Sequence, residues 1–131
     1  METRVSQAVE KKKSGRYNCA QSVACTYCDL AGLDEETMYA VAGAFGAGMG
    51  NMEGTCGALS GAGMVLGVRL HDRAAAMKAM WRVMTKFGER NGATVCKLLK
   101  GNGSGCALRA CDDCVADAAE FVEDELNAVG A

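Results

Sequence analysis

The chain has 131 residues, of which half are apolar and 23% are charged, and its formal net charge is −2. This composition excludes a disordered chain, and it carries no net positive charge that would favour binding to nucleic acid. The length suits one domain, so we expect residues 1–131 to form a single helical domain. Pro is absent, and β-branched and aromatic residues are few, which favours helices over a sheet.

The first third of the chain is predicted to form three helices. They cover residues 5–14, 19–31 and 34–45, where apolar spacing, capping residues and flanking glycines mark helical segments. Asn18 and Asp34 each precede one of these helices and can accept hydrogen bonds from its free backbone N–H groups.

The remainder of the chain begins with a glycine-rich stretch, residues 46–54, which is not expected to form regular structure. Four further helices are predicted after it, over residues 55–70, 72–88, 94–100 and 112–129. Thr55 is the expected cap of the first of them, and Gly88 is the expected end of the second. Because no segment alternates with a period of two residues, we predict an all-α fold, a compact bundle of about six or seven short helices.

Eight cysteines stand out in this composition, and their meaning depends on the cellular compartment. The first residues carry charge where a signal peptide needs an apolar segment, and the longest weakly polar run, Cys56–Val68, is too short to cross a bilayer. We therefore expect a cytoplasmic protein without a transmembrane segment. Thiols in the cytoplasm stay reduced unless they take part in redox or metal chemistry. The alternative is a secreted protein, in which the eight cysteines would form a disulfide scaffold.

Four of the cysteines lie at predicted helix starts: Cys19, Cys56, Cys96 and Cys111. A helix N-terminus presents unpaired N–H groups and a partial positive charge, and both stabilise a thiolate over a thiol. The thiolate is the form that attacks disulfides and that binds zinc or iron–sulfur clusters. We therefore expect these four cysteines to converge in the fold. The alternative is that they are small side chains packed in the core.

A short sequence motif surrounds each of these four cysteines. The fullest is Cys56-Gly-Ala-Leu-Ser-Gly61, and Asn18-Cys19-Ala-Gln-Ser-Val and Ala44-Phe-Gly-Ala-Gly-Met-Gly50 precede it. Cys96-Lys-Leu-Leu and Cys111-Asp-Asp-Cys-Val-Ala-Asp-Ala-Ala119 follow it. In this order the segments resemble the C-GCAxxG-C-C family, and the likeness covers nearly the whole chain.

The resemblance implies a redox-active protein whose four signature cysteines fall on Cys19, Cys56, Cys96 and Cys111. One departure is small: the family label places Gly before Cys and Ala, whereas Cys56 here precedes Gly57. The resemblance implies no particular substrate or reaction.

Two glycines of the central motif, Gly57 and Gly61, lie about one helical turn apart and leave part of that helix without side chains. One interpretation is that another helix approaches closely along this bare surface. The alternative is that the surface leaves room for a cluster or a substrate beside Cys56. Under the second interpretation Gly57 and Gly61 are candidate cofactor-binding residues.

The chain contains two C-x-x-C pairs, the arrangement typical of zinc sites and redox-active dithiols. Cys25 and Cys28 lie within the predicted second helix, on the side away from Cys19, so we expect them to be packed or to form an accessory dithiol. Cys114 lies in the same helical turn as Cys111 and can join a site with it.

Three classes of function follow from these thiols. The first is thiol–disulfide redox chemistry, with Cys56 as the nucleophile and a second cysteine to resolve the intermediate, which would make the protein a thiol oxidoreductase. The second is an iron–sulfur cluster or zinc site built from the same four helix-start cysteines, with Cys114 as a further ligand. The third is a structural helical module whose thiols are packed.

The partner implied by the first function is a redox protein or a small-molecule oxidant, and the sequence is compatible with a homo-oligomer. Nucleic acid is not an expected partner, because the basic run at residues 11–13 is short. His71, the single histidine, lies beside a predicted helix start, where a surface or capping residue is expected. Cys106 has no assigned role.

Overall fold

The computed structural model describes residues 1–130, and over these residues the chain is all-α, as predicted. Eight α-helices and one π-helical segment, η1, follow each other in the order α1 (Val5–Lys13), α2 (Cys19–Thr26), α3 (Cys28–Ala31), α4 (Glu35–Ala42), η1 (Gly48–Met52), α5 (Gly57–Leu70), α6 (Arg73–Asn91), α7 (Cys96–Leu99) and α8 (Cys111–Ala128). Residues 1–130 contain no strand, and their one β-type contact is an isolated bridge between Thr55 and Val95. No helix within these residues is both long enough and apolar enough to cross a membrane.

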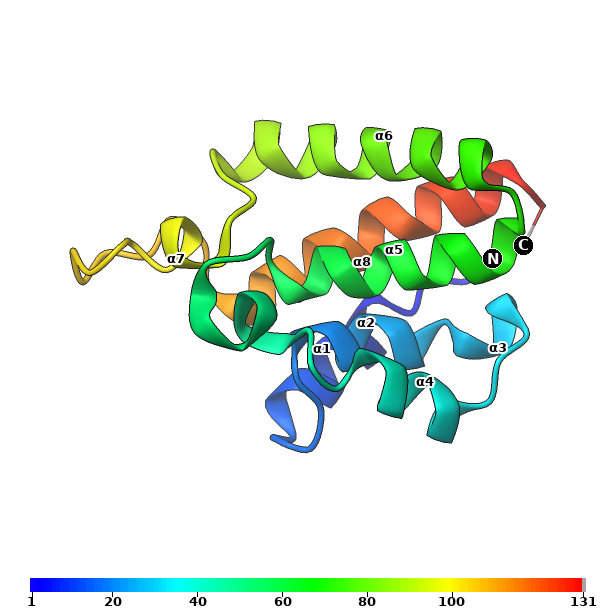
Figure 1. The fold of residues 1–131 in the computed structure, drawn as a ribbon, viewed down its shortest axis with the longest axis horizontal. Helices are drawn as coiled ribbons and strands as arrows, with labels where there is room; N and C mark the ends of the chain where they lie inside the picture. Colours follow the sequence, from blue (N-terminus) through cyan, green and yellow to red (C-terminus); the bar gives the residue numbers. More distant parts are fainter. Residues whose placement is uncertain (131) are drawn as a thin grey trace.

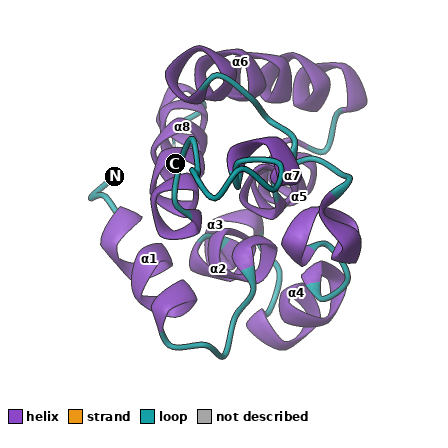
Figure 2. Ribbon diagram, turned by 90° about the vertical axis from the view of Figure 1, so that its left-hand side faces the viewer, coloured by secondary structure: helices purple, strands orange, loops and turns teal. Residues whose placement is uncertain are grey.

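Helix α5 lies at the centre of the fold and packs against α2, α6 and α8. Figure 1 shows α6 along one side, α5 and α8 side by side in the middle, and α1 to α4 on the other side, and Figure 2 shows the same arrangement from the end. Helices α2, α5 and α8 run in the same direction, so their N-termini lie at the end of the molecule that carries α7 (Figure 1).

The apolar core follows the helical spacing of the sequence. On α8, Val115, Ala118, Val122 and Leu126 recur every three or four residues and are fully buried. They pack in one cluster with Leu59 and Leu66 of α5 and with Val83 and Phe87 of α6. This shared core fixes the three long helices relative to one another and thereby fixes where their N-termini lie.

The predicted second helix is in fact two helices, since α2 ends at Thr26 and Tyr27 is not helical. The Arg4 guanidinium donates a hydrogen bond to the carbonyl oxygen of Thr26 (3.0 Å) and pairs with Asp29 (2.6 Å), so the N-terminal segment holds both sides of the break. The buried Tyr27 hydroxyl donates to the Glu123 carboxylate on α8. With η1, this division raises the number of elements above the six or seven expected.

Three predicted helix boundaries are wrong. The helix expected over residues 34–45 ends at Ala42, and Gly43 is its C-cap residue. Thr55 does not cap α5, because Cys56 is its N-cap residue and Thr55 is engaged in the isolated bridge. Helix α6 continues through Gly88 and ends before Gly92, which has a left-handed φ of 80° and donates its N–H to the Gly88 carbonyl (2.8 Å). The glycine-rich stretch does contain η1, although Met49 within it has a positive, non-helical φ.

Candidate functional site

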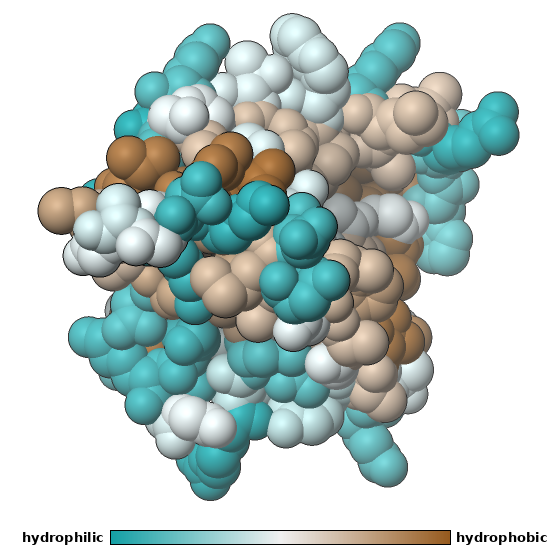
Figure 3. All heavy atoms as spheres, turned by 60° about the vertical axis from the view of Figure 1, so that its left-hand side comes forward, coloured by the Kyte–Doolittle hydropathy of each residue, from teal (hydrophilic) through white to brown (hydrophobic). Residues whose placement is uncertain are grey.

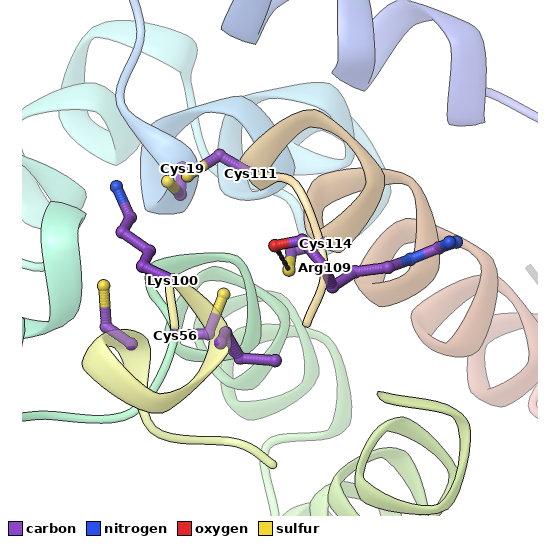
Figure 4. Close-up of a pocket in the computed structure, with 9 residues that line it drawn as sticks. Cys19, Cys56, Lys100, Arg109, Cys111 and Cys114 are labelled. Carbon is purple, nitrogen blue, oxygen red and sulfur yellow. Dashed lines mark hydrogen bonds between the residues drawn. The ribbon is translucent and has the colours of Figure 1, made fainter. Parts of the chain in front are cut away.

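Five cysteines line one pocket at the end of the molecule where α2, α5 and α8 begin (Figure 4). They are Cys19, Cys56, Cys96, Cys111 and Cys114, and the lining is completed by Gly57, Leu99, Lys100 and Arg109. The cavity is small, about 10 Å³, which is room for about one water molecule. The structure thus brings the four helix-start cysteines together and adds Cys114 to them.

Cys19 is the first residue of α2, and a capping box fixes the start of this helix. The Asn18 side chain accepts a hydrogen bond from the Gln21 backbone N–H (2.8 Å), and the Gln21 side chain accepts one from the Asn18 backbone N–H (2.9 Å). Asn18 also donates to the carbonyl of Gly43 after α4 (3.1 Å). Local sequence therefore determines where Cys19 enters the pocket.

Cys56 is the N-cap residue of α5, where this helix touches α2. A Cβ atom on Gly57 would lie 3.1 Å from the Cβ atom of Cys19, and one on Gly61 would overlap the carbonyl oxygen of Ala20. Gly61 therefore serves close helix packing. Gly57 serves the same packing and also lines the pocket beside Cys56.

Cys96 opens α7 and is held by the loop that leads into α5. Its backbone N–H donates to the Gly54 carbonyl (2.9 Å), and the Cys56 N–H donates to the Thr94 carbonyl (2.8 Å). At Gly48, with a positive φ of 57°, η1 approaches the Cys96 side chain so closely that no Cβ atom would fit. These contacts bring α7 against the start of α5.

Cys111 and Cys114 come from the first turn of α8. The preceding Arg109 donates hydrogen bonds at 3.0 and 3.1 Å to the buried carboxylate of Asp117, which fixes the path of the chain into the helix. The Cys114 thiol donates a weak hydrogen bond to the Arg109 carbonyl oxygen (3.9 Å), drawn in Figure 4.

The five thiols differ, because four of them form two pairs in which each thiol shifts the pKa of the other. Cys19 and Cys111 form the outer pair, and Cys56 and Cys114 form the inner pair. Figure 4 shows Cys19 and Cys111 pointing toward one another, with the Lys100 side chain directed toward them. Cys96 lines the same pocket and belongs to neither pair.

Within the outer pair, Cys111 is the thiol that ionises first. A hydrogen bond from Cys19 and another from the Lys100 ammonium lower the pKa of Cys111 to about 5, against the opposing effect of burial, and the charge of Lys12 adds to them. The same hydrogen bond raises the pKa of Cys19, which donates it. The pair therefore consists of a thiolate and a thiol at neutral pH.

The inner pair has the same asymmetry. The neighbouring Cys114 side chain lowers the pKa of Cys56, and the backbone amides of Ala58 and Leu59 in the first turn of α5 act in the same direction. The pKa of Cys114 is raised by the adjacent Cys56 and by burial. Burial also raises the pKa of Cys96.

Accessibility separates the two pairs. Cys111 is partly exposed, whereas Cys56 and Cys114 have relative exposures of 5% and 3%. Cys19 lies between these cases, at 9%. A dissolved molecule therefore meets Cys111 before it meets the other paired sulfur atoms.

The surface at this end of the molecule mixes apolar and hydrophilic side chains (Figure 3). Exposed apolar side chains come from the segments next to the pocket: Met49 on η1, Leu98 on α7 and Leu108 in the loop before α8. The Leu108 backbone N–H donates to the carbonyl of Leu99 (2.8 Å), so this loop lies on the pocket lining. The surroundings of the pocket thus combine apolar contacts with the positive charge of Lys100.

Other residues singled out in the sequence lie outside the pocket. Cys25 and Cys28 belong to a second apolar cluster with Met38, and burial raises the pKa of Cys25 to about 11. Cys106 is exposed in the loop before α8, and His71 is the C-cap residue of α5.

Two features of the pocket were missed in the sequence. Lys100 follows Cys96 by four residues, about one helical turn, and this spacing is the signal that could have identified it. The contact of Cys114 with Cys56 leaves no comparable signal, because it depends on how α5 and α8 pack together.

Four of the five pocket thiols fall into two pairs, and Cys96 is the fifth. Among residues 1–130, no group of three or more His, Cys, Asp or Glu side chains is placed to hold one metal ion. Structural zinc sites bring four ligands to a single point, whereas disulfide exchange needs sulfur atoms that meet in pairs.

Comparison with known proteins gives a family match over most of the chain. The family model described as "Putative redox-active protein (C_GCAxxG_C_C)" matches residues 17–125, a stretch that includes all five pocket cysteines. The comparisons with curated proteins and with solved structures found no significant match.

Proposed function

The chain belongs to the C-GCAxxG-C-C family, and we propose that it is a thiol oxidoreductase that exchanges disulfides through its outer pair, Cys19 and Cys111. The substrate in this proposal is the disulfide of a small molecule or of a redox protein. A cytoplasmic location is part of the proposal, since thiols there are kept reduced and ready to react.

The reaction begins when the Cys111 thiolate attacks one sulfur atom of the substrate disulfide. A mixed disulfide forms at Cys111, and the other half of the substrate leaves as a thiolate that takes a proton. Cys19 then attacks the Cys111 sulfur, loses its proton to the second leaving thiolate, and closes the Cys19–Cys111 disulfide. Two thiols of the protein are oxidised, and one substrate disulfide is reduced to two thiols.

One observation carries this proposal: the most exposed cysteine of the pocket is also the one with the strongest stabilisation of its thiolate, and it contacts a second thiol. Attack requires a thiolate that the substrate can reach, and resolution requires a partner thiol next to it. Cys56, which the sequence favoured as the nucleophile, also has a lowered pKa but is buried. We therefore assign the first attack to Cys111.

Trapping the mixed disulfide tests this assignment. The reduced protein is treated with oxidised glutathione in a Cys106→Ser background, which removes the exposed cysteine outside the pocket. Adding Cys19→Ser should accumulate glutathione on Cys111, because the resolving thiol is missing, and mass spectrometry of peptides identifies the site. Adding Cys111→Ser should abolish glutathione attachment in the pocket.

Cys25→Ser provides the matched control, because Cys25 is buried outside the pocket. It should form the Cys19–Cys111 disulfide as readily as the background protein. Glutathione on Cys56 in the Cys19→Ser protein would contradict the assignment of the attacking thiol. If oxidised glutathione produced no disulfide among the pocket cysteines of the background protein, the proposed function would be wrong.

The alternative function, zinc or iron–sulfur binding by the same cysteines, is supported by the five thiols that face one cavity. It has less support than disulfide exchange, because four of the five thiols are arranged in pairs. We expect protein purified without oxygen to be colourless and to contain far less than one metal ion per chain. A visible absorption band together with labile sulfide would favour the alternative.

A further inference from the structure

The inner pair has no role in the exchange described so far. Cys56 and Cys114 line the same pocket and are buried. A dissolved disulfide cannot reach either sulfur atom without opening the fold. Any oxidation of this pair in the folded protein must therefore pass through another thiol of the pocket.

The outer pair is placed to supply that route, because both pairs face the same small cavity (Figure 4). Cys111 and Cys114 are three residues apart on α8, so their side chains project from one face of the helix. On the opposite side of the cavity, Gly57 directly follows Cys56, and a Cβ atom there would lie 3.1 Å from the Cβ atom of Cys19. The space between Cys19 and Cys56 is thus kept free of an intervening side chain.

We propose that the inner pair is a second dithiol, which takes over the disulfide formed on the outer pair, so that one chain can store two disulfides. This inference rests on the proposed function, because the outer pair must first be oxidised by a substrate. The second substrate disulfide then reacts with the regenerated outer pair.

The transfer balances without any further oxidant. The Cys56 sulfur attacks Cys19, a Cys19–Cys56 bond forms, and the Cys19–Cys111 bond breaks. Cys56 attacks as a thiolate and Cys111 leaves as a thiolate to which Lys100 donates a hydrogen bond, so no proton moves in this step. Cys114 then attacks Cys56, the Cys56–Cys114 disulfide closes, and the proton of Cys114 passes to Cys19.

This sequence of steps predicts a capacity and an order of events. The Cys106→Ser protein is treated with an excess of oxidised glutathione, and samples are quenched with acid at successive times and mapped by mass spectrometry. The Cys19–Cys111 disulfide should appear first, and the chain should end with two disulfides and four released glutathione thiols. Adding Cys114→Ser should halve the glutathione released, because only one disulfide can then form.

Cys25→Ser is the matched control, since Cys25 is buried in the second apolar cluster and does not line the pocket. It should retain both disulfides and the full release of glutathione. Circular dichroism of each reduced variant establishes that the helices are intact before the reaction is measured.

Two results would overturn the inference. One is a background protein that stops at a single disulfide under excess oxidised glutathione. The other is a Cys111→Ser protein that forms the Cys56–Cys114 disulfide as fast as the background, since the inner pair would then be oxidised directly. Failure of the proposed function looks different, because the Cys19–Cys111 disulfide would be absent from the background and from Cys114→Ser alike.

Discussion

At Cys111, a thiolate is stabilised by groups from several parts of the chain. Cys19 at the start of α2 and Lys100 after α7 donate hydrogen bonds to its sulfur atom, and the start of α8 adds a favourable dipole. Cys19 is also the first residue of a helix, yet its pKa is raised because it donates the hydrogen bond. A position at a helix start therefore does not by itself decide which thiol ionises.

The pH dependence of alkylation should distinguish Cys111 from a buried thiol. With a pKa of about 5, Cys111 should react with iodoacetamide at half its plateau rate near pH 5 and at a constant rate above about pH 7, because thiolate governs the rate. Cys25, with a pKa of about 11, should become reactive only in alkaline solution. Peptide mass spectrometry after timed alkylation measures both. A midpoint for Cys111 near the ordinary thiol value of 9.0 would contradict this assignment.

Lys100→Met removes the ammonium group that donates to Cys111 and should raise the pKa of that thiol. The alkylation rate of Cys111 at pH 5 should fall by about tenfold, since the loss of a neighbouring positive charge costs about one to two powers of ten in thiolate fraction. Lys97→Met is the control, because Lys97 pairs loosely with Glu53 (3.9 Å) and does not line the pocket. Equal rates for the two variants would show that Lys100 does not act on Cys111.

Among the elements, the contact between α2 and α5 does most to bring the cysteines together. It places the N-cap residue of α5, Cys56, next to the first residue of α2, Cys19, and it depends on two glycines that face α2. The sequence motif thus has a structural meaning: glycines at one-turn spacing allow two helix starts, each carrying a cysteine, to meet.

Gly61→Ala should therefore destabilise the protein. The added Cβ atom would overlap the Ala20 carbonyl. The backbone shifts that remove such an overlap typically lower the free energy of unfolding by about 1–3 kcal/mol. Gly67→Ala on the same helix is the control, because its Cβ atom would meet nothing within 4 Å, and it should stabilise the protein by about 0.4–1 kcal/mol. Urea denaturation of the reduced proteins gives both free energies of unfolding. A neutral Gly61→Ala would mean that α2 and α5 are less closely packed.

For the whole molecule, much of the fold could be predicted from the sequence because it is set locally. Helical periodicity and the caps at Asn18 and Asp34 indicate an all-α chain and most helix starts. The break at Tyr27 was missed because Arg4, far away in the chain, supplies the hydrogen bond to the carbonyl of Thr26.

The candidate site also has features set by the local sequence and features set by contacts between distant residues. Convergence of the cysteines follows from their positions at helix starts together with the resemblance to a family. Their division into an outer and an inner pair does not, because it arises from packing between α2, α5 and α8. The local sequence therefore identifies which cysteines belong to the site. Long-range contacts decide which of them form pairs.

Asp117 is one such long-range contact, since its buried carboxylate joins α8 to Arg90 on α6 and to Arg109 before α8. Asp117→Asn should lower the free energy of unfolding at pH 7 by about 2 kcal/mol, the usual cost of losing hydrogen bonds to a charged group. Asp124→Asn, which removes an exposed pair with Lys86 (3.3 Å), should change it by less than about 0.5 kcal/mol.

The effect of Asp117→Asn should also depend on pH. Burial raises the pKa of Asp117, but hydrogen bonds from Arg109, Arg90 and Asn91 outweigh burial and hold that pKa below its ordinary value of 3.8. The stabilisation is then present at neutral pH and is lost as the pH falls through this lowered pKa. The difference between Asp117→Asn and the unaltered protein should therefore shrink in strongly acidic urea titrations. A difference that stays constant with pH would contradict the role of the ionised carboxylate.

The central claim is that Cys19 and Cys111 form the reactive dithiol, and the most direct test is the identity of the first disulfide. Fully reduced protein with all eight cysteines is treated with less than one equivalent of oxidised glutathione, quenched with acid, alkylated and mapped by mass spectrometry. The account predicts that the Cys19–Cys111 disulfide exceeds every other product at the earliest times. A first disulfide between Cys25 and Cys28, or one in which neither Cys19 nor Cys111 takes part, would contradict it.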